Sequence, residues 1–146
     1  MSVDEDEKTL NQIAIQAQLI QRQGQALQQQ IEMMQTTVSD LQATIDSLDN
    51  LSKAKDMGLL PIGAGVYITC KQVDTDAVLL SVGSGLIVSK KASDAGDILR
   101  KRQKSVTDAL DKANASMAGI NQQMQDLNAK ASVLAARIED VRPTQR

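Results

Sequence analysis

Apolar residues recur at alternating spacings of three and four along two long segments, residues 2–57 and 93–141. This spacing is typical of helices whose a and d positions form one apolar seam in a coiled coil. In the first segment the remaining heptad positions are mostly Gln, Asn, Asp, Thr and Ser, as expected for a solvated helix face. The large seam residues include Ile13, Ile20, Leu27, Ile31, Leu41 and Ile45 in the first helix and Leu110, Ile120, Leu127, Leu134 and Ile138 in the second.

The two seams are equally long, which predicts how the helices pair. If the chain folds back between them, the helices run antiparallel and the innermost seam residues, Ser52 and Leu99, meet. Walking outward from that pair places Gly24 opposite Leu127 and Val38 opposite Ala113. Small residues then face large ones, which keeps the packing density even. In the same register Leu48 faces Gln103, a poor pair.

The ends of both helices carry recognisable boundary residues. Ser2 with Glu5 three residues later has the spacing of a capping box. The first helix is expected to stop at Gly58, because glycine favours the position after a helix end. Ser93 or Asp94 is expected to cap the second helix, and Pro143 to end it.

The segment between the helices, residues 59–92, contains a short internal repeat. Residues 62–68 and 82–88 share the order β-branched, Gly, small, Gly and three apolar residues. Glycine supplies the positive φ angles of tight hairpin turns, so each copy predicts strand, turn and strand. The expected strands are 60–63, 66–73, 77–83 and 86–91, and the turn glycines are Gly63, Gly65, Gly83 and Gly85.

Composition excludes several classes of function. The 146 residues include no Phe, Trp or His, one Tyr and one Cys, and the net charge is −2. Without His, and with no nucleophile–base–orienter set, we expect neither an enzyme nor a metal or cofactor site. Gly58–Gly63 has the glycine spacing of a phosphate loop, but Ala64 stands where Lys is required. The basic run 100–104 lacks aromatics, so we expect a solvated face, not nucleic-acid binding.

The chain shows no signal-peptide pattern and no long apolar window in its sequence. We therefore expect no membrane association and a cytoplasmic location. The mainly α chain divides into a first helix (1–58), a β module (59–92) and a second helix with a short tail (93–146).

Four short strands cannot enclose a core, and their unpaired edges need a cover. We therefore expect the β module to pair with other chains in a barrel-like body. The residues expected at that oligomerisation surface are Ile62, Val66, Tyr67, Ile68, Val78, Leu80, Val82, Leu86, Ile87 and Val88.

Two long heptad helices flanking two hairpins, with the segments 61–65 and 81–85 at the turns, resemble the α subunits of archaeal prefoldin. This resemblance implies a hexamer of two α and four single-hairpin β subunits. It also implies an ATP-independent chaperone that holds unfolded proteins at its coiled-coil tips and passes them to a group II chaperonin. A filament-forming prefoldin relative is the alternative, and a plain coiled-coil spacer is a third possibility that the β module argues against.

A few large apolar residues lie outside the seam near the free ends of the helices. Ile15, Leu19 and Val133, together with Ala136, come close together in the expected register, in which residue 19 is level with 132 and residue 15 with 136. They predict either one apolar strip for unfolded clients or ordinary scattered surface residues.

Overall fold

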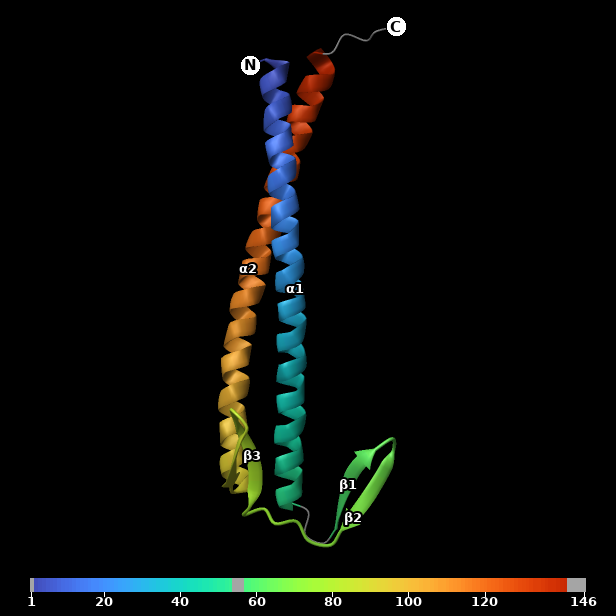
Figure 1. Cartoon of the computed structure of the whole chain (residues 1–146), viewed down its shortest axis with the longest axis vertical. Coiled ribbons are helices and arrows are strands. Elements are labelled where there is room, and N and C mark those ends of the chain that lie inside the picture. Colours follow the sequence, from blue (N-terminus) through green and yellow to red (C-terminus); the bar gives the residue numbers. More distant parts are fainter. Residues whose placement is uncertain (1, 54–56, 142–146) are drawn as a thin grey trace. The chain divides into compact units, whose positions relative to one another are not determined.

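The computed structural model describes residues 2–53 and 57–141, and the Ser52 side chain is also outside the described part. Two long helices, α1 (Val3–Lys53) and α2 (Ala92–Val141), are joined by two antiparallel hairpins (Figure 1). Strands β1 (Gly58–Gly63) and β2 (Val66–Cys70) form the first hairpin, and β3 (Val78–Gly83) and β4 (Leu86–Lys90) the second. The predicted class, a helical hairpin with a small β module, is confirmed.

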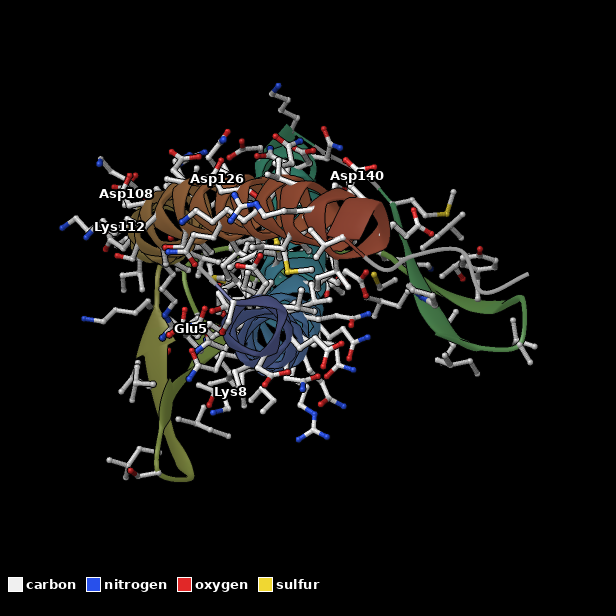
Figure 2. The ribbon with its side chains drawn as sticks, turned by 90° about the horizontal axis from the view of Figure 1, so that it is seen from above. Glu5, Lys8, Asp108, Lys112, Asp126 and Asp140 are labelled. Atoms are coloured by element: carbon white, nitrogen blue, oxygen red, sulfur yellow. The ribbon has the colours of Figure 1, made fainter. Side chains whose placement is uncertain are left out.

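The chain divides into two compact units. The terminal unit combines α1 up to Met33 with α2 from Ala109 onward, and the central unit runs from Met34 to Asp108. The predicted seams are confirmed in each unit, because every described seam side chain except Val141 is buried or half-buried. Charged residues such as Lys8 and Asp126 of the terminal unit point away from the helix pair (Figure 2).

The predicted register is wrong by one heptad. In the terminal unit a Cβ added to Gly24 would lie 3.4 Å from Cγ2 of Ile120, which precedes the expected partner Leu127 by seven residues. In the central unit Gln103 does not face Leu48. Its Nε2 donates a hydrogen bond of 2.8 Å to Oε1 of Gln42.

Seam residues with small or polar side chains explain the error. Asp6 continues the α1 seam toward the N-terminus and is buried, although its side chain is acidic. Ala92 and Gly96 continue the α2 seam toward the hairpins and are buried as well. Counting only large apolar residues therefore places the start of each seam too late.

The helix ends agree with the prediction only at the N-terminus of the chain. Glu5 Oε2 accepts a hydrogen bond of 3.3 Å from the Ser2 backbone N–H, which is one of the two hydrogen bonds of a capping box. The second helix begins before the predicted caps. The Lys91 carbonyl accepts a hydrogen bond from the Ala95 N–H at 2.9 Å, so Lys91 is the N-cap residue of α2. Gly58 begins β1 instead of ending α1, and Pro143 lies outside the described residues.

Both hairpins close through the same turn. Gly63 pairs with Val66 and Gly83 with Leu86, so two residues form each loop. Ala64 has φ 47° and the glycine that follows it has φ 77°, as a type I′ turn requires. Since Ser84 and Gly85 have φ 53° and 75°, the predicted repeat is a repeat of turn geometry too.

The second hairpin packs on the helices of its own chain. Leu80 of β3 is buried in a cluster with Ile45 and Leu48 of α1 and Leu99 of α2. Val78 and Val88 are packed against the same cluster. The Thr75 carbonyl accepts from the Ala92 N–H at 2.8 Å, which ties the connection between the hairpins to the start of α2.

Candidate functional site

The described residues 2–53 and 57–141 contain no group of His, Cys, Asp and Glu side chains that could hold a metal ion. Over the same residues, neither α1 nor α2 has a stretch apolar enough to span a membrane. Cys70 is half-buried, and its Sγ lies 3.5 Å from the Gly58 carbonyl oxygen across the first hairpin.

Four large apolar side chains outside the seam are exposed in the terminal unit, and one of them, Met33, is 70% exposed. Ile15 is 61% exposed, Leu19 56% and Val133 61%, and Ala136 is exposed as well. Because burial of apolar surface is the main driving force for association, these side chains are available to bind other apolar groups. Their number is small, so their arrangement decides whether they act together.

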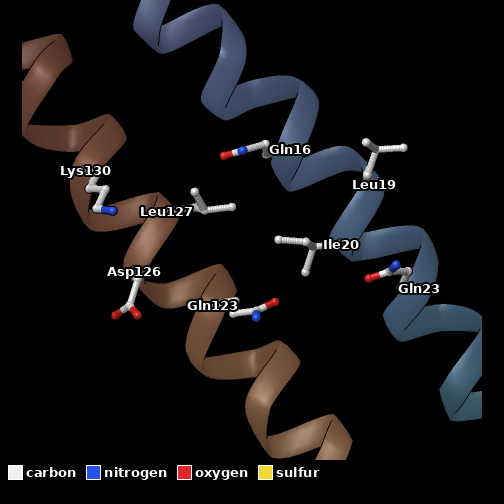
Figure 3. Close-up of a pocket in the computed structure, with 8 residues that line it drawn as sticks. All are labelled: Gln16, Leu19, Ile20, Gln23, Gln123, Asp126, Leu127 and Lys130. Carbon is white, nitrogen blue, oxygen red and sulfur yellow. The ribbon is translucent and has the colours of Figure 1, made fainter.

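Leu19 lines a groove between α1 and α2, here called groove A, of about 430 Å³. Figure 3 shows Ile20 and Leu127 pointing toward one another across this groove. The eight residues that line it combine an apolar floor with polar rims and are Gln16, Leu19, Ile20, Gln23, Gln123, Asp126, Leu127 and Lys130.

Val133 lines a second groove of the terminal unit, groove B, of about 410 Å³. Its seven lining residues carry no acidic side chain and are Thr9, Ile13, Ala129, Lys130, Val133, Leu134 and Arg137. Lys130 belongs to both grooves, so the two follow the same flank of the helix pair.

The structure brings the predicted strip together only in part. Leu19 and Val133 lie in consecutive grooves, whereas Ile15 and Ala136 line neither. The residues expected to lie level with one another on the two helices were wrongly matched. They followed the predicted register, which differs from the observed register by one heptad. Sequence reasoning also missed Lys130 and Arg137, which a search of the flanking g positions of both seams would have found.

Arg137 is held by a buried carboxylate. Its Nη1 lies 3.4 Å from Oδ1 of Asp6, whose side chain is only 5% exposed while that of Arg137 is 47% exposed. This ion pair links the two helices at the end of groove B, so Arg137 keeps a fixed position beside the groove.

The predicted oligomerisation residues fall into two groups. Val78, Leu80 and Val88 are turned toward the helices of the same chain, as described above. The other seven are exposed and remain free to contact another chain: Ile62, Val66, Tyr67, Ile68, Val82, Leu86 and Ile87.

Three of the four basic side chains in the run 100–104 have partners within the chain. Arg100 forms ion pairs with Asp49 at 3.0 Å and with Asp97 at 3.3 Å. Arg102 donates to the Ser81 carbonyl at 2.9 Å, and Lys104 pairs with Asp108 at 3.1 Å. The Arg100–Asp49 pair links α2 to α1 and the Arg102 hydrogen bond links α2 to β3, whereas the other two contacts lie within α2.

Comparisons with a family model and with individual proteins point to the same family. A family model described as "Prefoldin subunit" matches residues 20–137. The "Prefoldin subunit alpha" of Methanobrevibacter smithii is 36% identical over 93 residues, which are 62% of this chain and 63% of that protein. That of Pyrococcus horikoshii is 30% identical over 130 residues, 87% of this chain and 88% of its own length.

A solved structure has a similar fold. It is described as the cryo-EM structure of filamentous PFD from Methanocaldococcus jannaschii. The two chains superpose with a TM-score of 0.66 and 19% identity, over 82% of this chain and 98% of that one.

Proposed function

This chain belongs to the prefoldin family as a subunit of the archaeal α type, and we propose that it acts as an ATP-independent holdase. In this proposal the terminal unit binds exposed apolar segments of unfolded proteins. The bound proteins are then passed to a group II chaperonin. The observation that carries the proposal is the pair of apolar grooves in the terminal unit, with Leu19 in one and Val133 in the other.

The client-binding strip of the proposal comprises Ile15, Leu19, Val133 and Ala136. Its three large residues are each more than half exposed, so client binding would require no prior opening of the helix pair. One strip buries little apolar surface and would bind weakly. Several subunits acting on one client would raise the overall affinity through effective concentration.

Assembly is proposed to use the β module. The seven exposed oligomerisation residues described above cover both hairpins, and an isolated two-stranded hairpin is only marginally stable in water. Pairing with hairpins of other subunits would cover these residues and the free strand edges. We propose a cytoplasmic hexamer of two such chains and four single-hairpin β subunits, with a barrel-like body.

A filament of this one chain type is the second candidate. The observation that favours it is the similarity in fold to a chain whose structure is described as filamentous. A filament would use the same exposed hairpin residues, but it would not need a β subunit.

Light scattering distinguishes the two assemblies. The mass of the purified chain is measured alone and after mixing with a candidate single-hairpin subunit from the same genome. A closed complex of about six chains that forms only on mixing supports the holdase assembly, and long polymers of this chain alone support the filament.

A further inference from the structure

Grooves A and B place charge on one rim only. Lys130 and Arg137 lie on α2, seven residues apart, so about 10 Å separates them along the helix axis. The α1 residues at the opposite rim are Thr9, Gln16 and Gln23, all uncharged. The floor between the rims is apolar, with Ile20 and Leu127 in groove A and Ile13 and Leu134 in groove B.

The Lys130 side chain is available to a ligand. It is exposed, and it takes part in none of the ion pairs Arg100–Asp49, Arg100–Asp97, Lys104–Asp108 and Arg137–Asp6. Arg137 is also half-exposed while it contacts Asp6, which is itself buried. The solvent-accessible charge along groove B is therefore positive.

We propose that the grooves bind amphipathic α-helical segments of client proteins that carry acidic residues along one edge. This inference rests on the proposed holdase function and names its preferred ligand. A client helix lying along the grooves would bury its apolar face on the floor, as helix-in-groove ligands do. Acidic residues seven apart on that helix would match the spacing of Lys130 and Arg137.

An extended client segment cannot place two acidic residues against both Lys130 and Arg137. A strand rises about 3.3 Å per residue, so a distance of about 10 Å corresponds to three residues. Residues three apart in a strand point to opposite faces, and only one of the two carboxylates could then approach the rim. Asp126, on the α2 side of groove A, disfavours a further acidic residue there.

Peptide binding to the full-length chain tests the proposal. Three fluorescently labelled peptides of equal length and apolar content are compared by anisotropy at low salt. The first is an amphipathic helix with Glu residues seven apart on one edge, the second has Lys at those positions, and the third alternates apolar and Glu residues as a strand does. We expect the first to bind about fivefold more tightly than the second, as two exposed ion pairs predict.

Charge reversal in the protein provides the matched control. Lys130→Glu should abolish or invert the preference for the acidic helix. Lys112→Glu, which makes the same change at an exposed site of α2 outside both grooves, should preserve it. Equal binding of all three peptides, or an unchanged preference in Lys130→Glu, would overturn the inference.

Aggregation suppression on the same preparations separates the two proposals. If the chain suppresses the aggregation of a denatured protein but shows no helix or charge preference, the inference fails and the holdase function stands. If suppression is absent as well, both fail.

Discussion

Gly24 of α1 packs against Ile120 of α2, with 3.4 Å between an added Cβ and Ile120 Cγ2. This contact sets the register of the terminal unit one heptad away from the pairing that equal seam lengths predict. A glycine at this seam position leaves room for the β-branched partner. The distance is also just long enough for a methyl group.

Gly24→Ala is expected to stabilise the chain. Alanine removes the helix penalty of glycine, about 0.5–1 kcal/mol, and its methyl group would touch Ile120 without displacing it. Gly119→Ala is the matched control, because no atom lies within 4 Å of an added Cβ there and only helix propensity changes. Urea unfolding measures both variants, and a destabilised Gly24→Ala would contradict the observed packing.

Cysteine cross-linking tests the register directly. In a Cys70→Ser background, the pair Gly24→Cys with Ile120→Cys is expected to form a disulfide under mild oxidation. Gly24→Cys with Leu127→Cys should not, because seven residues along a helix add about 10 Å, beyond the reach of a disulfide. Efficient cross-linking of the second pair alone would instead support the predicted register, in which Gly24 faces Leu127.

Because Asp6 is buried and Arg137 is half-exposed, replacing one partner of this ion pair should affect stability differently from replacing the other. Arg137→Met is expected to destabilise the helix ends by about 1–3 kcal/mol, because it leaves a carboxylate of 5% exposure without its cation. Asp6→Leu should be neutral or stabilising, since it restores an apolar seam residue and leaves a half-exposed Arg137 in water. Hydrogen exchange of the amides of residues 3–13 measures both, and the opposite order of effects would contradict this account.

The two hairpins offer a matched pair of leucines. Leu60 and Leu80 hold the same place in the two hairpins, since Leu60 pairs with Ile68 and Leu80 with Val88. Yet Leu80 is 9% exposed in the intrachain cluster and Leu60 is 48% exposed. Leu80→Ala should therefore cost about 2–3 kcal/mol in the stability of the chain itself. Leu60→Ala should change that stability by no more than about 0.5 kcal/mol.

If the first hairpin joins other subunits, Leu60→Ala should weaken assembly, which light scattering measures. Equal destabilisation of the isolated chain by both variants would show that the hairpins are packed alike.

The sequence predicted the elements well because their patterns are local. The heptad spacing located both helices, and the glycine repeat located both turns. The positive φ of Ala64 and Ser84 was not predicted, because only the glycines were expected to adopt it. Helix pairing depends instead on which residues end the seam. Asp6 and Gly96 are seam residues that hydropathy does not mark, so the register and the levels of the strip residues were predicted wrongly.

The candidate site was predictable only as a set of residues. Ile15, Leu19 and Val133 stand out by heptad position, and their exposure follows from it. Their grouping into grooves depends on the register and on long side chains from the facing helix, as at Lys130. Leu80 shows the same limit in the β module, because its burial results from tertiary packing on α1 and α2.

Suppression of aggregation by the assembled protein tests the central claim most directly. The variant Ile15→Ser, Leu19→Ser, Val133→Ser is compared with the unchanged chain and with Met33→Ser. Met33 shares the heptad position of Leu19 and Val133 and is 70% exposed, but it lines neither groove. The account predicts that the triple variant keeps its assembly mass and loses most of its ability to keep a denatured protein in solution, while Met33→Ser retains it. Full suppression by the triple variant would contradict the claim that this surface binds clients.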